Sequence, residues 1–371
     1  MKKLTDSQSF FLNAVRFVAA AMVVMYHGFC GFFNRVGVDR HTEPYYERLG
    51  FVGVSTFFIL SGFVIAYTVA RKASAPGGYS LKTYLIERVS RIYIVLIPAL
   101  AAVVLVDIFL LKRVSPDLDF CVSPRTIFAA LLMVNNVTVF GENVAFTPTI
   151  YGMEPAWSLA FEMCFYVLFG LIVLFSDPRR YRPAKIVALV ATLVFLSRLP
   201  LAFLMSYNWL LGVLGVYLLP RDIMLKRSAC IGLMGAVILA TAGVLALAGG
   251  QAALQNNWIS ISLLAAVFYA LFMASGTFAI GARLGAAAKF LASYSYSMYL
   301  LHYTLLNVAY DYLFDVQVIY AKGPAARVLF LTSLFLAINA LSFLFSLATE
   351  KNTSRLRKLL LHAPEAPAVG T

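Results

Sequence analysis

The stretch AVRFVAAAMVVMYHGFCGFF, residues 14–33, decides the fold class. Apart from Arg16 and His27 it is apolar, and it is long enough to cross a bilayer as an α-helix. Eleven helical steps of about 100° return to within about 20° of the starting direction and rise roughly 16 Å, so both side chains share one face. A cation near the bilayer centre costs about 2.5–3.5 kcal/mol on insertion scales, and a bound anionic ligand is one way to offset that cost. The alternative is an arginine that reaches the interface and a histidine bonded to a neighbouring helix.

The composition of the whole chain is typical of a membrane protein. Of its 371 residues, 61% are apolar and 13% are charged, whereas a soluble protein is nearer half apolar and a quarter charged. The formal net charge is +13, but the basic residues fall in short loops between apolar runs. That distribution reports orientation in a lipid bilayer, and it argues against nucleic acid as a partner.

The apolar runs predict an all-α, polytopic transmembrane bundle of about ten helices. The expected spans lie at about residues 10–33, 50–70, 92–111, 157–176, 184–199, 202–219, 229–249, 258–280, 288–311 and 326–348. Because Lys and Arg are concentrated in alternate loops, the positive-inside rule places both termini in the cytoplasm. We expect residues 1–350 to form one integral-membrane domain and residues 351–371 to form a basic cytoplasmic tail that is partly disordered.

A second polar cluster lies in the segment Trp157-Ser-Leu-Ala-Phe-Glu162-Met-Cys-Phe-Tyr166. Ser158, Glu162 and Tyr166 recur at i, i+4 and i+8, so they share a polar face on an otherwise apolar helix. A carboxylate inside a membrane is a functional hypothesis by default. A structural hydrogen-bond acceptor explains Glu162 as well, and Trp157 also suits an interfacial belt.

Two further clusters carry polar side chains at helical spacing. Ser295, Tyr299 and His302 lie on one face of the expected span at 288–311, where core packing with satisfied hydroxyls is the alternative to a site. Arg88 and Arg91 lie one turn apart at the start of the third span, where they suit a phosphate clamp. Anchoring of the helix on the cytoplasmic side explains the same two arginines.

Neither the histidines nor the cysteines have the spacing of a metal site, and no Walker loop or dinucleotide fingerprint occurs in the sequence. The residues concerned are His27, His41, His302 and His362, and Cys30, Cys121, Cys164 and Cys230. We therefore expect no metal cofactor.

In their order along the chain, these motifs resemble membrane acyltransferase family 3, which includes O-antigen and nodulation-factor O-acyltransferases. The matching elements are Arg16 to His27, Phe57-Phe58-Ile-Leu-Ser61-Gly62-Phe63, Arg88 to Ile92, Trp157 to Tyr166, Ser293 or Ser295 to His302, and Glu350. Two departures each remove an acidic residue that many relatives carry. Ser55 stands at one of these positions, before the double Phe, and Met163 at the other, after Glu162. Neither position can therefore be assigned proton transfer.

The resemblance implies a multi-pass enzyme of the inner (plasma) membrane that transfers an acyl group, usually acetyl, from cytoplasmic acyl-CoA. The acceptor it implies is a hydroxyl of a glycan or of another lipid-linked or secreted molecule. In this interpretation Arg16, Arg88 and Arg91 hold the CoA phosphates, and His27 is the general base or carries the acyl group covalently. Glu162 orients His27 or the acceptor. The expected substrate-binding residues are Trp157, Ser158, Tyr166, Tyr299 and His302.

A proton-coupled transporter or flippase is the competing hypothesis, because intramembrane Arg, His and Glu also form proton relays. It predicts substrate flux without consumption of acyl-CoA. The sequence shows no repeated halves with interrupted helices of the kind that many transporters carry.

Overall fold

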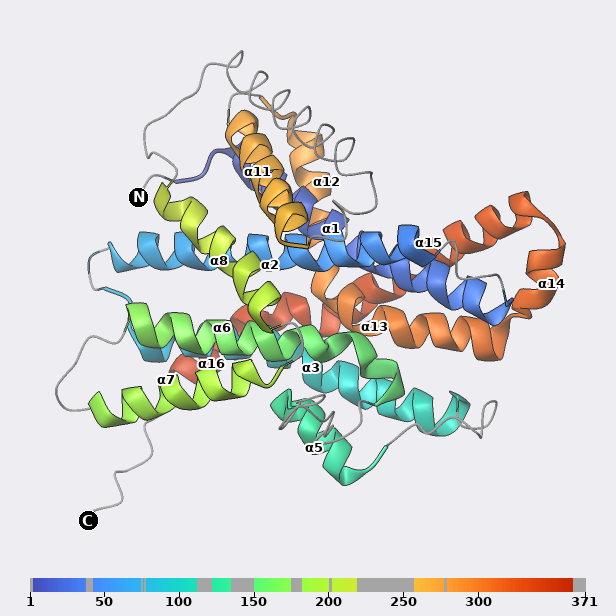
Figure 1. Ribbon diagram of the computed structural model, residues 1–371, viewed down its shortest axis with the longest axis horizontal. Helices are drawn as coiled ribbons and strands as arrows, with labels where there is room; N and C mark the ends of the chain where they lie inside the picture. Colours follow the sequence, from blue (N-terminus) through green and yellow to red (C-terminus); the bar gives the residue numbers. More distant parts are fainter. Residues whose placement is uncertain are drawn as a thin grey trace.

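The computed structural model describes residues 3–37, 43–74, 76, 78–111, 122–134, 150–174, 182–199, 202–218, 257–276 and 279–362. All regular structure in these ranges is helical, and they contain no strand. Several long helices, among them α2, α3, α6 and α13, run roughly along the long axis of the molecule (Figure 1). The predicted all-α fold is thus confirmed for this part of the chain.

The α-helices are α1 (Asp6–Arg35), α2 (Glu43–Ala73), α3 (Leu81–Val106), α5 (Pro124–Leu132), α6 (Trp157–Val173), α7 (Arg182–Ser197), α8 (Ala202–Leu218), α11 (Asn257–Ser275), α12 (Ala282–Ala292), α13 (Ser295–Val308), α14 (Val316–Ala321), α15 (Pro324–Ala348) and α16 (Thr353–His362). Two π-helical segments, η2 (Asp107–Leu111) and η4 (Ala309–Leu313), extend α3 and α13. Two 3₁₀ segments, η3 (Tyr151–Ala156) and η5 (Glu350–Asn352), precede α6 and α16.

Five stretches in the described ranges are long and apolar enough to cross a membrane. They are Asp6–Arg35, Arg48–Ala73, Leu81–Leu110, Gly152–Val173 and Pro324–Leu361. Shorter apolar helices at Pro183–Ser197, Ala202–Tyr217 and Ser260–Ser275 coincide with three further expected spans. The expected span at 229–249 lies outside the described residues. The count of about ten and the side that each terminus faces stay predictions.

The expected continuous helix at 288–311 is wrong, because the chain breaks between α12 and α13. At the break the Ser293 hydroxyl donates to the Phe290 carbonyl at 2.7 Å, and the Ser293 amide donates to the same oxygen at 3.0 Å. Tyr294 then leaves the helical region, with φ −130° and ψ 9°. A serine that bonds back to its own helix competes with the next turn, and this local competition ends α12.

Local capping fixes where the first and third helices begin. The Thr5 side chain accepts from the Gln8 amide while the Gln8 side chain accepts from the Thr5 amide, so a complete capping box starts α1. Ser80 caps α3 through the Thr83 amide. These caps set the register of the two helices that carry Arg16, Arg88 and Arg91.

Glycines let α2 and α8 cross with their backbones in contact. A Cβ on Gly62 would collide with the Trp209 carbonyl, and a Cβ on Gly212 would collide with the Ile59 carbonyl. Small residues at helix crossings permit this close approach in membranes. Gly62 and Gly212 thus allow α2 and α8 to pack closely against each other.

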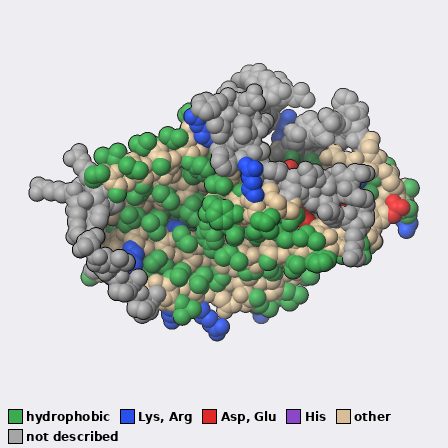
Figure 2. Space-filling model, turned by 90° about the horizontal axis from the view of Figure 1, so that it is seen from below, with side chains coloured by type: hydrophobic (Ala, Val, Ile, Leu, Met, Phe, Trp, Pro, Cys, Tyr) green, Lys and Arg blue, Asp and Glu red, His purple; other side chains and the backbone are tan. Residues whose placement is uncertain are grey.

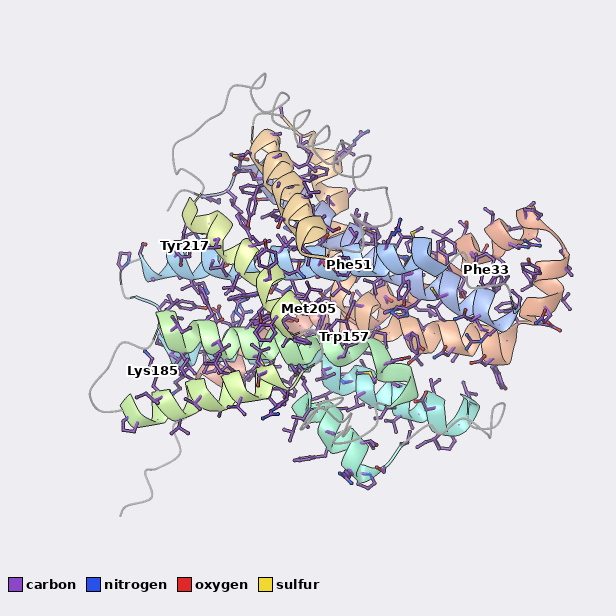
Figure 3. The ribbon with its side chains drawn as sticks, in the orientation of Figure 1. Phe33, Phe51, Trp157, Lys185, Met205 and Tyr217 are labelled. Carbon is purple, nitrogen blue, oxygen red and sulfur yellow. The ribbon has the colours of Figure 1, made fainter. Side chains whose placement is uncertain are left out.

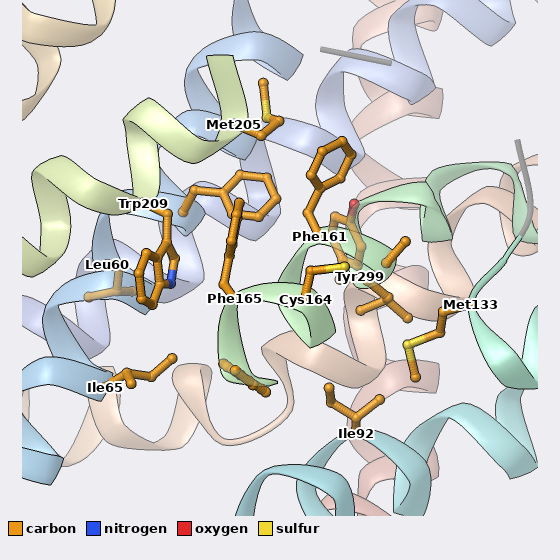
Figure 4. Close-up of a cluster of buried hydrophobic side chains, with 14 of the residues drawn as sticks. Leu60, Ile65, Ile92, Met133, Phe161, Cys164, Phe165, Met205, Trp209 and Tyr299 are labelled. Atoms are coloured by element: carbon orange, nitrogen blue, oxygen red, sulfur yellow. The ribbon is translucent and has the colours of Figure 1, made fainter. Parts of the chain in front are cut away.

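The apolar core lies between α2, α3, α6 and α8, and α13 is at the centre of the molecule, where it contacts α1, α3, α15 and η3. Phe165 of α6 stacks on Trp209 of α8 with ring centroids 5.1 Å apart (Figure 4). On the outside, apolar side chains cover a broad, continuous area of one face (Figure 2). Exposed apolar residues such as Val187 and Phe203 fit a surface that faces lipid rather than water.

The predicted tail at 351–371 begins with ordered structure. Its first residues form η5 and then α16, which packs against α3. Residues 363–371 lie outside the described ranges. The last helix therefore returns the chain to α3, the helix that carries Arg88 and Arg91.

Candidate functional site

A central cavity of about 90 Å³, with room for several water molecules, lies between α1, α2, α3, α6 and α13. Most of the site residues predicted from the sequence line it, namely Arg16, Arg88, Arg91, Ser158, Glu162, Tyr166 and Tyr299. Phe57, Ser61, Ile92 and Tyr296 are among the other lining residues. Five separate helices thus bring polar side chains to one interior space.

Arg88 is held in this cavity by aromatic rings. Its guanidinium carbon lies 5.4 Å from the ring centre of Tyr84 and 5.7 Å from that of Tyr166, which are cation–π distances. Its Nε is buried and has no hydrogen-bond partner within the described ranges. A buried guanidinium with a free N–H is able to bind an anion that enters the cavity.

Two carboxylates accompany the arginines. The Tyr166 hydroxyl donates to Glu162, and the charges of Glu162 and Glu350 both act on Arg16 and Arg91. Because the three cavity arginines outnumber these two carboxylates, the cluster has an excess of positively charged side chains.

Glu350 itself is fixed by α13. One carboxylate oxygen, Oε2, accepts from the Ser297 hydroxyl at 3.0 Å and from the Ser297 amide at 3.2 Å. This bond ties η5, at the end of α15, to the first turn of α13. The position of Glu350 is therefore set by the same helix that supplies Tyr299 to the cavity.

Tyr299 joins α13 to the start of α6. Its hydroxyl donates to the Pro155 carbonyl at 2.8 Å, and the Ser158 hydroxyl lies 2.7 Å away. Since a tyrosine hydroxyl has one hydrogen and the carbonyl only accepts, Ser158 is the donor in the second bond. Together the two hydrogen bonds fix the orientation of the Tyr299 and Ser158 hydroxyls.

His27 and His302 form a pair beyond Tyr299. Their ring centroids are 5.2 Å apart, and the ring of His302 is 5.9 Å from that of Tyr299. His27 also packs against Tyr303 with ring centroids 5.1 Å apart. Neither histidine lines the cavity, so Tyr299 stands between the arginine cluster and the histidine pair.

The hydrogen bonds of His302 define its tautomer. Its Nδ1 lies 2.8 Å from the Tyr299 carbonyl oxygen, and because that oxygen can only accept, Nδ1 carries the hydrogen. In the neutral ring Nε2 is then an acceptor. It is buried and lacks a hydrogen-bond partner in the part of the chain that the structure describes.

Two predicted site residues have other surroundings than expected. Trp157, at the junction of η3 and α6 (Figure 3), lines a separate small pocket together with Met133 and Met153. Glu162 lies with the arginines, and within the described ranges no hydrogen bond joins it to His27. The structure thus gives Glu162 neighbours that suit charge balance better than orientation of an imidazole.

Some side chains at or near the site received no role from the sequence. Tyr296 lines the cavity, and the charge of Glu350 acts on the arginines. Asp107 is fully buried at the far end of α3. For both acids the available signal is an ionisable residue within or next to an apolar run. The described residues contain no group of three or more His, Cys, Asp or Glu able to hold a metal ion.

Comparisons with known proteins agree with the motif order. The family model for acyltransferase family 3, described as an acyltransferase domain, matches residues 9–347. O-acetyltransferase OatA of Staphylococcus aureus (strain NCTC 8325 / PS 47) is 28% identical over 175 residues, which make up 46% of this chain and 27% of that protein. A putative O-acetyltransferase of S. aureus (strain COL) is 27% identical over 184 residues, or 46% of this chain and 26% of that protein. The matches thus span about a quarter of the length of these relatives, and no solved structure matches the chain.

Proposed function

Because the chain belongs to acyltransferase family 3, we propose that it transfers an acetyl group from acetyl-CoA to a hydroxyl of a glycan or other cell-envelope or secreted acceptor. The observation that carries this proposal is the arrangement along α1. Arg16 faces a cavity with surplus positive charge, and His27, about 16 Å further along the same helix, faces the buried imidazole of His302. An anion site and a proton acceptor at that separation suit a long donor with phosphates at one end and a reactive thioester at the other.

Arg16, Arg88 and Arg91 are the proposed ligands of the donor phosphates. A guanidinium presents a planar fork of N–H donors that matches phosphate oxygens, and it keeps its charge when buried. The free Nε of Arg88 supports this role, as does the excess of arginines over carboxylates. In this proposal Glu162 and Glu350 balance the buried charge before the donor enters.

His27 is the proposed general base. It takes the proton of the acceptor hydroxyl while the oxygen bonds to the thioester carbonyl carbon, the carbon–sulfur bond breaks, and the proton passes to the departing CoA thiolate. A positioned base of this kind contributes about 10²–10⁴ to the rate. The adjacent Nε2 of His302 is a second acceptor that can orient the hydroxyl.

The setting in the cell follows from the same argument. CoA thioesters are cytoplasmic, so the arginine end of the bundle faces the cytoplasm in this proposal and the acceptor approaches from the opposite side of the plasma membrane. The positive-inside pattern of the loops supports that orientation.

The test uses the purified full chain in lipid vesicles with ¹⁴C-labelled acetyl-CoA and a bacterial envelope glycan fraction. The expected result is an alkali-labile label on the glycan together with release of one CoA per acetyl group. Proton movement across the vesicle membrane without any consumption of acetyl-CoA would overturn the proposal in favour of a transporter.

A further inference from the structure

A second layer of buried polar groups lies at the end of α3 opposite to Arg88 and Arg91. Its first member, Asp107, is fully buried and stands about 24 Å along the helix from Arg91. On α13 the same layer contains Thr304 and Asn307, both buried, just beyond His302. The histidine pair therefore lies between the arginine cluster and this layer.

Only one oxygen of Asp107 is used. Its Oδ2 accepts from the Gly152 amide at 3.3 Å, and the Gly152 carbonyl in turn accepts from the Thr304 hydroxyl at 3.0 Å. A Cβ on Gly152 would come within 2.6 Å of Val103, so η3 is fixed tightly between α3 and α13. The other oxygen, Oδ1, has no hydrogen-bond partner among the described residues.

Asn307 has a free hydrogen-bond donor, whereas Asp107 has a free acceptor. It lies one turn beyond Thr304, and its Oδ1 faces Nη2 of Arg35 at 3.3 Å. Since a guanidinium only donates, the atom facing Arg35 is the amide oxygen, and Nδ2 is the free donor. Nδ2 is buried without a partner in the described ranges, while Arg35 is held in place by Asp311 at 2.6 and 2.7 Å.

The free oxygen of the ionised Asp107 carboxylate, which is linked through Gly152 to Thr304, only accepts, and the free amide nitrogen of Asn307, one turn further along α13, only donates. Together they complement a hydroxyl, which donates once and also accepts. We propose that Asp107 and Asn307 form a binding subsite for the hydroxyls of a carbohydrate acceptor, next to the histidine pair on the side away from the arginines. This inference rests on the proposed function, and it names the residues that recognise the acceptor. Their remaining atoms, Oδ2 of Asp107 and Oδ1 of Asn307, hold the subsite in place through Gly152 and Arg35.

Two substitutions change only the free atoms. Asp107→Asn keeps an oxygen for the Gly152 amide and places an NH₂ where Oδ1 stood. Asn307→Asp keeps an oxygen for Arg35 and places an acceptor where Nδ2 stood. The double variant Asp107→Asn/Asn307→Asp exchanges donor and acceptor and keeps the formal charge of the wild-type chain.

The experiment measures the affinity of the vesicle-reconstituted chain for chitotriose, a hydroxyl-rich trisaccharide, by saturation-transfer NMR without acetyl-CoA. Each single variant is expected to weaken binding about tenfold to a hundredfold, the loss of one hydrogen bond to a charged or buried group. The double variant is expected to recover most of that affinity. Thermal unfolding of all four proteins is measured in parallel.

Three results would overturn the inference. One is absence of chitotriose binding to the wild-type chain, and another is single variants that bind it as well as wild type. The third is a double variant that regains thermal stability without regaining affinity, which indicates a purely structural pair. The chitotriose measurement contains no acetyl-CoA, so it does not depend on acetyl transfer. Failure of acetyl transfer in the vesicle assay would therefore count against the proposed function alone.

Discussion

The arginine cluster and the histidine pair share helix α1, yet they differ in almost every physical property. At Arg16, α1 and α13 border a cavity with carboxylates and further arginines around it. At His27, about three turns further along α1, the same helices are packed through aromatic rings, and no residue of the cavity lining is a histidine. The charged region opens onto the central cavity, whereas the two imidazoles are packed among aromatic rings.

The difference follows from what each side chain tolerates in a membrane. A guanidinium cannot lose its proton, so a buried Arg needs carboxylates, π faces or ligand phosphates around it. An imidazole, by contrast, can lose its proton, and the neutral ring packs as an aromatic ring with one donor and one acceptor. In the proposed function, binding and chemistry are therefore separated along α1, and we expect that each region can be altered without the other.

The largest effect is expected for His27→Ala. Acetyl transfer should fall by about 10²–10⁴ while affinity for acetyl-CoA stays at the wild-type value, because the proposed phosphate site lies three turns away. Label transfer and donor binding are measured on the same preparation, with Val18→Ala, an exposed position on α1, as the control. If His27→Ala transfers the acetyl group at close to the wild-type rate, His27 is not the general base, and the proposed contrast between the two regions fails.

Arg16→Lys tests the other region. We expect the Kd for acetyl-CoA to rise about tenfold or more, since a point charge replaces the planar fork, while the rate at saturating donor changes little. The matched control is Arg327→Lys, an arginine that packs on Tyr320 far from the cavity. A lower saturating rate with unchanged Kd would assign Arg16 to the chemistry instead.

Tyr299→Phe probes the boundary between the two regions. The change leaves the Pro155 carbonyl and the Ser158 hydroxyl without their partner in a buried site, and we expect transfer to slow about tenfold. Tyr207→Phe, which removes a more exposed tyrosine–serine bond, serves as the control. Steady-state kinetics with donor and acceptor varied separately would show which side Tyr299 serves, and an unchanged rate would contradict a bridging role.

The smallest effect is expected for Ser297→Ala. Glu350 loses the bond from the serine hydroxyl but keeps the one from the backbone amide, so KM for acetyl-CoA should rise only about threefold. Ser346→Ala, which removes a serine bond within α15, is the matched control. A change in the saturating rate with KM unaffected would mean that Glu350 acts on the histidine pair.

Much of this site was predictable because helical spacing alone relates its members. Arg16 and His27 share a face of one uninterrupted helix, and the polar side chains of α6 at 158, 162 and 166 line one cavity, as their periodicity indicates. Spacing within a helix is a local property, and it survives whatever the helix packs against.

Relations between helices were not predictable in this way. Periodicity does not tell which residues face Glu162: the structure places it in one cavity with the arginines of α1 and α3, and its expected role in orienting His27 or the acceptor stays a prediction. The break at Ser293 depends on a serine that bonds to its own helix, a choice that the apolar pattern does not reveal. The sequence pattern does not single out Asp107 and Asn307, because single polar residues near helix ends are common and only burial distinguishes these two.

The crossing of α2 and α8 has a consequence for substrate size. Leu60 and Ser61 belong to the cavity wall, and directly behind them the peptide groups of Gly62 and Gly212 rest on the opposite backbone. Because main chain rather than further side chains lies behind Leu60 and Ser61, this part of the wall cannot move outward to make room for a bulkier ligand. This side of the cavity is therefore rigid, and a larger ligand can be accommodated only by movement of the other walls.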